Sequence, residues 1–389
     1  MPASFEIPTS SAYELEPPSP EVKRYERLKL CASVASLVVS LALLTIAALV
    51  IGPQLNDVLE EEVTENYWLR LAILAFIYAV ALELLTLPID FWSGYVLEHR
   101  FQLSNQTLRG WIWKRIKGYL LGGPLGLALL CGLYALLWFS GPWWWLWAAA
   151  GWLAVTLVLG QLLPVLILPL FYKVTALDDP SLLARLRGIA DGTGLTVEGI
   201  YRLHLSAETK KANAALAGLG RTRRVLLSDT LLDSFTPEEI EVVFAHEVGH
   251  HVHRHLLKMV AWHVFLAALG FWIVDWILRQ SALTLGYPAY DDPAALPVLL
   301  LVLTLFGLLL SPAQNALSRL FERQCDRYAL KRTQMPGAYR SAFIKLARMN
   351  KSDPDPHPIV VWLFDDHPPI RQRLAMADTV CSPTRNGAT

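Results

Sequence analysis

The segment Leu28–Ile51, LKLCASVASLVVSLALLTIAALVI, carries no charged residue after Lys29. As an α-helix it would extend about 30 Å, which is enough to cross the hydrocarbon core of a bilayer. An uncharged apolar run of this length is typical of a transmembrane helix. The segment therefore predicts that the chain is an integral membrane protein.

Further apolar runs of similar length recur along the chain. They predict five more spans, at Trp68–Pro88, Tyr119–Phe139, about 144–171, about 256–278 and about 296–310. Pro164 and Pro169 are expected to kink the fourth span, because proline removes a backbone hydrogen bond inside a helix. We therefore expect about six spans, with a count of six or seven.

Composition narrows the class of protein further. Of the 389 residues, 54% are hydrophobic and 17% are charged, and 34 basic residues balance 34 acidic ones. Intrinsic disorder would require low hydrophobicity and high net charge, so the chain as a whole is folded. A nucleic-acid binder would show a basic excess, which is absent. The four cysteines are far apart and include no CxxC pair, so neither a disulfide framework nor a cysteine metal site is expected.

The predicted fold is mostly α: a multi-span α-helical membrane protein with a small α+β domain on the cytosolic side. Basic residues precede the first span and acidic residues follow it, so the positive-inside rule places both termini in the cytosol. The expected organisation is a disordered tail at 1–27, four spans at 28–171 with a cytosolic loop at 91–117, a cytosolic segment at 172–255, two spans at 256–314 and a cytosolic helical segment at 315–389.

The cytosolic segment 172–255 shows helix and strand signals. We expect a helix at 180–191 and strands at 194–201 and 223–227. Thr236-Pro237-Glu238-Glu239 forms a capping box with proline at the first helical position, which predicts a helix start. The helix that begins there carries the residues of greatest chemical interest.

His246-Glu247-Val248-Gly249-His250 is an HExxH motif. Residues i and i+4 of a helix leave the same face one turn apart, so both imidazoles can bind one Zn²⁺. Glu247 is offset around the helix and reaches the metal-bound water instead of the metal. Zinc lowers the pKa of that water to about 7, and Glu247 can accept its proton as general base. The motif therefore predicts a zinc metallopeptidase.

A catalytic zinc needs a third protein ligand from elsewhere in the chain. Glu322 and Asp326, beyond the sixth span, are i and i+4 on a predicted helix. One could bind the metal while the other holds a ligand histidine by its free ring N–H. Spacing equally allows both to be exposed carboxylates paired with neighbouring arginines. His251 and His253 are expected to be solvated, and His255 is expected to be a buried, hydrogen-bonded histidine.

Several stretches together are similar to one family. They are LEHRFQLSNQTL at 97–108, Asn213-Ala214, RVLLSDTLL at 224–232, the HExxH motif, FERQCDRYA at 321–329 and His367-Pro368-Pro369. The chain resembles the Ste24-type CaaX prenyl proteases, integral-membrane zinc metalloproteases of peptidase family M48. The resemblance covers about residues 68–378. Eukaryotic members have an additional N-terminal span, so the count of six spans is open by one.

The resemblance implies roles for individual residues. It implies that Glu322 is the third zinc ligand and that Asp326 is a hydrogen-bond partner of a ligand histidine. It implies that His367 and Arg373 reach the scissile carbonyl. Cys325 stands where the family has alanine. Asn213 and Ala214 would bind substrate beside an edge strand, where an extended peptide could add by β-augmentation.

The resemblance also implies partners and location. It implies one Zn²⁺ per chain, a peptide or protein substrate with or without a prenylated C-terminal CaaX-like motif, the lipid bilayer and no nucleic acid. It implies a ring of spans around a water-filled chamber, which would surround polar residues such as Glu83 within the spans. The active site would face the cytosol, in a bacterial inner membrane or an endoplasmic reticulum membrane depending on the source.

Three other functions compete with this one. A quality-control protease of the heat-shock type shares the chemistry but has fewer spans. A site-2-type intramembrane protease has HExxH inside a span and a later Asp-Gly ligand, whereas here HExxH precedes its span and Asp191-Gly192 lies upstream. A catalytically inactive membrane scaffold would not need an intact Glu247.

Overall fold

The computed structural model describes residues 17–195, 199–218, 222–285 and 287–381. They form long helices and one small sheet, and they divide into two compact units. The bundle unit contains Leu28–Leu162 and Leu256–Ser311. The sheet unit contains the described residues up to Arg27, Leu163–His255 and the chain from Pro312 onwards.

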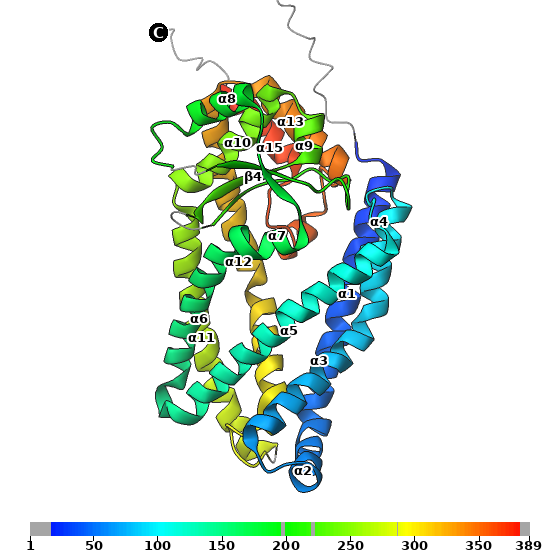
Figure 1. The fold of residues 1–389 in the computed structure, drawn as a ribbon, viewed down its shortest axis with the longest axis vertical. Helices are drawn as coiled ribbons and strands as arrows, with labels where there is room; N and C mark the ends of the chain where they lie inside the picture. Colours follow the sequence, from blue (N-terminus) through cyan, green and yellow to red (C-terminus); the bar gives the residue numbers. More distant parts are fainter. Residues whose placement is uncertain (1–16, 196–198, 219–221, 286, 382–389) are drawn as a thin grey trace, which may run out of the picture. The chain divides into compact units, whose positions relative to one another are not determined.

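Six helical stretches among the described residues are long and apolar enough to cross a membrane. Three of them contain a π-helical turn. Their elements are α1 Pro20–Ile46 with α2 Gly52–Glu62, α3 Tyr67–Phe91 with α4 Leu97–Arg100, α5 Leu108–Phe139, α6 Trp144–Leu162 with α7 Leu168–Phe171, α11 His255–Thr284 and α12 Leu296–Thr333 (Figure 1). The expected six spans are thus confirmed by length and composition. Pro164 lies in the π turn Leu163–Ile167 that separates α6 from α7.

The helices are longer than the apolar runs that predicted them, and two expectations need correction. Residues 20–27, assigned to a disordered tail, form the first turns of α1, while residues 1–16 lie outside the described residues. The expected loop 91–117 is mostly helical, since a π turn and α4 continue α3 and since α5 starts at Leu108. Hydrophobicity marks the part of a helix that faces lipid, whereas backbone hydrogen bonds continue the helix into water.

Several charged side chains inside the bundle unit form ion pairs. Trp144 Nε1 donates to Asp275 Oδ1 at 2.6 Å, and Arg279 pairs with the same carboxylate at 3.0 Å. The carboxylate of Glu83 pairs with Arg115 at 2.5 Å, and Arg115 also pairs with Asp90 at 2.9 Å. These charged groups are therefore neutralised by opposite charges, as a low-dielectric surrounding requires.

The sheet unit is built on four short strands in the order β1-β2-β4-β3. They are β1 Val174–Ala176, β2 Ile200–Leu203, β3 Ala214–Ala217 and β4 Arg224–Ser228. β2 and β4 are parallel, and the other two pairings are antiparallel. β3 is thus an edge strand. The strand expected at 194–201 is shorter and later than expected; it starts at Ile200, and 196–198 lie outside the described residues.

The sheet unit also contains six helices beyond those of the candidate spans. They are α8 Pro180–Ala190, α9 Asp229–Ser234, α10 Pro237–Val252, α13 Pro336–Asn350, α14 Pro358–Leu363 and α15 Ile370–Cys381 (Figure 1). Of these, α9 and α10 contact the strands directly. The core between α8, α10 and β4 contains the fully buried side chains of Leu186, Leu227 and Phe244. This packing holds α10 against β3 and β4, and so places the HExxH helix beside the edge strand.

Candidate active site

The helix α10 starts at the predicted capping box. The side chain of Thr236 accepts from Glu239 N, and Glu239 Oε2 accepts from Thr236 N at 2.8 Å. Ten residues later His246 and His250 lie on one face, with ring centroids 5.3 Å apart. His246 is buried and His250 is half-buried. The cap therefore fixes the start of a helix whose third and fourth turns carry both imidazoles.

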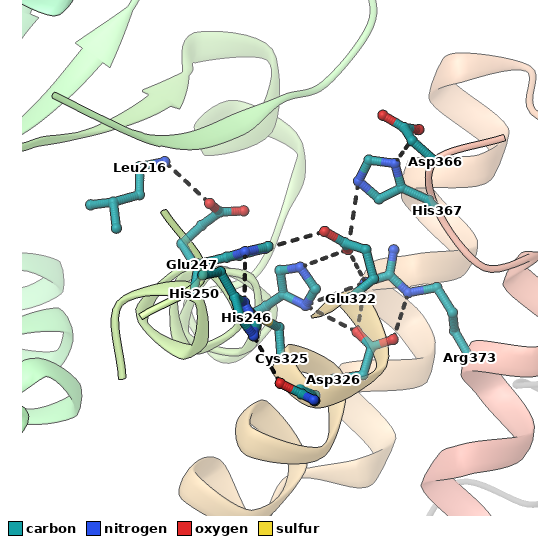
Figure 2. Close-up of polar contacts among 12 residues, drawn as sticks. Leu216, His246, Glu247, His250, Glu322, Cys325, Asp326, Asp366, His367 and Arg373 are labelled. Atoms are coloured by element: carbon teal, nitrogen blue, oxygen red, sulfur yellow. Dashed lines mark hydrogen bonds and ion pairs between the residues drawn. The ribbon is translucent and has the colours of Figure 1, made fainter. Parts of the chain in front are cut away.

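Glu322 of α12 faces both imidazoles. His246 Nε2 lies 3.1 Å from Glu322 Oε2, and His250 Nε2 lies 3.2 Å from Glu322 Oε1 (Figure 2). Two ring nitrogens and one carboxylate thus converge from two helices, although Glu322 is 72 residues from His250 and 76 from His246 in sequence. This is the number and kind of protein ligands that a catalytic Zn²⁺ uses, with one position left open.

The other ring nitrogen of His246 contacts Asp326. His246 Nδ1 lies 3.0 Å from Asp326 Oδ1, and Arg373 of α15 holds the same carboxylate through contacts of 2.6 and 2.9 Å. An ionised carboxylate only accepts, so His246 donates from Nδ1 and turns Nε2 toward Glu322, where Nε2 could bind a metal in place of a proton. The Arg373 guanidinium also packs on the Phe343 ring at 3.9 Å.

The site has the electrostatics of a cation site. Burial opposes protonation of His246, but its hydrogen bonds to Asp326 and Glu322 outweigh burial and raise its pKa to about 9. Glu322 Oε2 is buried and makes no well-oriented hydrogen bond, although His246 Nε2 is near it. The acidic neighbours thus favour a positive charge between Nε2 and the Glu322 carboxylate, and a divalent cation bound there would supply that charge in place of the proton. The residues present therefore fit a zinc ion.

Cys325 forms a second candidate ligand group with the same histidines. Ligand atoms of His246, His250 and Cys325 lie within 4.8 Å of one another. Cys325 Sγ, however, is 3.5 Å from His255 Nδ1, and that atom is 3.2 Å from His250 Nδ1. Cys325 thus lies toward the Nδ1 side of the His250 ring, whereas Glu322 faces Nε2. The converging Nε2 atoms favour Glu322 as the third ligand.

Gly249 explains why a small residue is needed at position 325. A Cβ on Gly249 would lie 3.0 Å from Cys325 Cα and 3.2 Å from its sulfur. The backbones of α10 and α12 therefore approach closely at this point. Glycine in HExxH and a small side chain before Asp326 allow the approach that brings Glu322 to the histidines.

Glu247 points toward the edge strand. Its Oε2 accepts a hydrogen bond of 3.1 Å from the backbone N–H of Leu216 in β3 (Figure 2). Ala215 and Ala217 flank Leu216 in β3. In an antiparallel pair, every second residue directs its backbone N–H and C=O at the partner strand, and the residues between direct theirs away from it. The Leu216 N–H therefore lies on the open edge. No sequence pattern predicts this contact, since it depends on backbone register.

Asn213 and Ala214 lie where that edge begins. Asn213 is exposed, its N–H donates to Ser228 Oγ at 2.9 Å, and its carbonyl accepts from Ser228 N at 2.9 Å. Ala214 is the first residue of β3 and pairs with Leu227. The backbone of Asn213 is thus engaged with β4, and its side chain is exposed to the solvent.

His367 and Arg373 occupy different environments. The His367 side chain is 56% exposed, and its Nε2 lies 3.5 Å from Glu322 Oε2. Its Nδ1 contacts Asp366 Oδ1 at 2.7 Å, and this hydrogen bond raises the pKa of His367. Arg373 is buried and is engaged with Asp326. Of the two, His367 is the side chain open to an incoming substrate.

Arg319, one turn before Glu322 on α12, holds the loop that carries His367. Its guanidinium donates to the carbonyl of Val361 at 2.7 Å and to the carbonyl of Asp365. The side chain is buried, and it lines a cavity of about 530 Å³ beside α14 and α15. From spacing alone, this arginine was expected only as one of the arginines that could pair with Glu322 or Asp326.

Comparison with known proteins places the chain in a family. Residues 176–380, which include all the side chains in Figure 2, match the model for peptidase family M48. The chain belongs to peptidase family M48. Residues 19–173 match the CAAX prenyl protease N-terminal family, which is described as having five membrane helices. The described residues of this M48 peptidase contain four candidate spans in that range.

Relatives of this M48 peptidase include both bacterial and eukaryotic proteins. It is 29% identical to the "Uncharacterized metalloprotease YhfN" of Bacillus subtilis over 308 residues, covering 78% of this chain and 72% of the relative. It is 30% identical to "CAAX prenyl protease 1" of Saccharomyces cerevisiae over 326 residues, covering 78% and 71%. The crystal structure of S. mikatae Ste24p matches its fold with a TM-score of 0.79 at 23% identity, covering 92% of this chain and 88% of that one.

These findings make the chain a multi-pass membrane metallopeptidase of the CAAX prenyl protease type. The expectations about fold class, family and enzyme class are thereby confirmed. The site-2-type and inactive-scaffold alternatives have no support in the family assignment.

The ion pair of Asp326 with Arg373 yields a stability prediction for this M48 peptidase. Asp326→Ala should destabilise the fold by about 3–5 kcal/mol, because it leaves the Arg373 charge buried without its partner. Asp378→Ala is the matched control, because it breaks an arginine–aspartate pair whose carboxylate is 66% exposed and should cost about 1 kcal/mol or less. Thermal unfolding in detergent measures both. Equal losses of stability in the two variants would mean that the buried ion pair contributes no more to stability than an exposed one.

Proposed function

We propose that this chain is an integral-membrane zinc endopeptidase in which His246, His250 and Glu322 hold one Zn²⁺. The observation that carries the proposal is the approach of two Nε2 atoms to one carboxylate, at 3.1 and 3.2 Å. A surface helix with solvated histidines would not bury Glu322 between them. A zinc ion bound there would polarise the scissile carbonyl and activate a water for attack.

Glu247 is the proposed general base. Its carboxylate is half-buried and lies between the histidine helix and the open edge of β3, where it accepts from Leu216 N. From this place Glu247 can accept a proton from the attacking water and pass it to the leaving amine. The Leu216 N–H limits the directions in which the carboxylate can point.

We assign stabilisation of the developing oxyanion to His367. Its ring is exposed, reaches to 3.5 Å from Glu322, and favours the protonated form through its contact with Asp366. Arg373, which sequence analysis placed in the same role, is engaged by Asp326 through two hydrogen bonds. We therefore propose that Arg373 acts through Asp326 and His246 and does not contact the substrate.

The proposed substrate is a peptide in extended conformation. β3 is an edge strand whose outward backbone groups lie beside Glu247, so a substrate strand added there would bring its scissile bond to the metal. The exposed side chain of Asn213 is available to bind the substrate backbone. Relatives named CAAX prenyl proteases support a C-terminal CaaX peptide as the substrate class.

Charge bias in the loops supports a cytosolic active site and cytosolic termini.

Metal removal tests the proposal directly. Purified protein should contain one zinc per chain, should lose peptide hydrolysis after dialysis against a chelator, and should regain it with Zn²⁺. Metal analysis and cleavage of a quenched fluorescent peptide measure the two quantities. Full activity in a metal-free preparation would overturn the proposed function.

A peptide series tests the substrate class. Matched CaaX peptides, farnesylated and unmodified, are compared with an internal peptide of the same core sequence. We expect the farnesylated peptide to be cleaved with a kcat/KM at least about tenfold higher, a difference of about 1.4 kcal/mol from burial of a small part of the lipid. Equal rates for all three peptides would contradict CaaX specificity and favour general turnover of membrane proteins, while zinc-dependent cleavage would still stand.

A further inference from the structure

His255, the first residue of α11, is buried beside the site and has no role in the chemistry above. Its side chain is among the most buried polar groups, with 2% of the residue exposed. Its ring stacks on Phe321 with centroids 4.2 Å apart and planes at 10°. This packing fixes the plane of the imidazole and therefore the direction of both its nitrogens.

Both ring nitrogens of His255 have short contacts. Nε2 lies 2.9 Å from Oε1 of Gln324, and Nδ1 lies 3.2 Å from Nδ1 of His250. An amide oxygen only accepts, so His255 donates from Nε2 and its Nδ1 carries a lone pair. That lone pair accepts from the Nδ1–H of His250. The Nε2 of His250, on the Glu322 side, is then left unprotonated.

The reverse direction of these two hydrogen bonds is incompatible with metal binding at His250. If His255 accepted at Nε2, it would donate from Nδ1, and His250 would have to accept at Nδ1 and carry its proton on Nε2. A protonated Nε2 cannot bind a metal. Cys325 Sγ lies 3.5 Å from the same His255 Nδ1, and because a thiol can donate or accept, this contact is compatible with either direction.

We propose that His255 and Gln324 are positioning residues that fix the tautomer of His250 and so set the zinc affinity of the site. The inference rests on the proposed function, since it assumes that His250 binds zinc through Nε2. The two ligand histidines would then be oriented by different means. His246 donates to the charged Asp326, whereas His250 donates to a neutral histidine–glutamine pair. Neighbours of this kind commonly change metal affinity by about 10–100-fold.

Substitutions at Gln324 test the direction of the hydrogen bonds. Gln324→Lys places a donor against His255 Nε2. This reverses the direction of both hydrogen bonds and should weaken zinc binding about 10–100-fold. Gln324→Met has similar length and removes the acceptor without supplying a donor, so its loss should be clearly smaller. Gln324 is half-buried, so either side chain can be accommodated. The zinc dissociation constant is measured by competition with a chromophoric chelator.

Substitutions at His255 provide the rescue test. His255→Leu should also weaken zinc binding about 10–100-fold, and His255→Gln should restore part of it, because its amide oxygen can accept from His250 Nδ1. Phe321→Leu is the packing control; it removes the stacked ring but keeps the acceptor, and it should change zinc affinity less than His255→Leu does. Unfolding temperatures identify any variant that fails to fold. If a His255 variant does not fold, the comparison of Gln324→Lys with Gln324→Met tests the positioning role.

The outcomes separate the two proposals. Wild-type zinc affinity in both Gln324→Lys and His255→Leu would overturn the positioning role and leave the proposed function intact. Equal losses in Gln324→Lys and Gln324→Met would also overturn it, because a packing effect does not depend on hydrogen-bond direction. A wild-type protein that binds no zinc would overturn both proposals.

Discussion

Glu247→Gln should bind zinc as tightly as the wild-type protein and hydrolyse peptides about 10²–10⁴-fold more slowly. The substitution preserves the length of the side chain and an oxygen that can accept from Leu216 N, so the contact of 3.1 Å can persist. The amide cannot accept a proton from the attacking water. The chemical step should therefore fail while the metal site stays assembled.

The matched control for this variant is Glu238→Gln. Glu238 lies on the same helix, is 46% exposed and pairs with Arg185 at the surface. The Glu238→Gln substitution should change neither zinc content nor turnover by more than about twofold, because breaking an exposed ion pair has little effect. Zinc content and single-turnover peptide cleavage are measured for both variants. Wild-type turnover in Glu247→Gln would exclude Glu247 as the general base.

Glu322→Ala should release zinc and abolish turnover. Glu322 contributes the only carboxylate that approaches both Nε2 atoms in the described part of the chain, at 3.1 and 3.2 Å. Without it, two histidines remain, which is one ligand fewer than a catalytic zinc requires. The loss of affinity should exceed the roughly 10–100-fold that follows removal of a residue supporting a ligand.

Cys325→Ala decides between the two candidate ligand sets. Cys325 belongs to the group of ligand atoms within 4.8 Å, but it lies toward the Nδ1 side of His250. Alanine fits beside Gly249, so the substitution should retain zinc and most activity. Zinc retained in Glu322→Ala but lost in Cys325→Ala would assign the third ligand to the thiol. Metal analysis after dialysis distinguishes these results.

Local patterns predicted the parts of the site that lie close together in sequence. The capping box at Thr236 and Glu239 formed as expected, because both hydrogen bonds lie within one helical turn. The same holds for the one-turn separation of His246 and His250, which follows from helix geometry alone. Helix ends were predicted less well, since hydropathy detects lipid contact and does not detect where backbone hydrogen bonding stops.

Roles that depend on packing between distant segments were not predictable from spacing. Spacing left open whether Glu322 or Asp326 faces the histidines, because both are on one face of α12. The close approach at Gly249 and Cys325 sets the height and rotation of α12 against α10, and it directs Glu322 to Nε2 and Asp326 to Nδ1 of His246. The role of Arg373 likewise became visible only through its burial against Asp326.

The sequence by itself determined that this is a multi-span membrane protein with a helix carrying two imidazoles and a carboxylate. Those properties arise from apolar length and helical period, which are local. Only the tertiary structure decided that Glu322 faces the histidines, that Glu247 meets the Leu216 N–H on a sheet edge, and that His255 contacts His250. Such contacts join segments through packing and backbone register, and neither is a function of any one stretch of the chain.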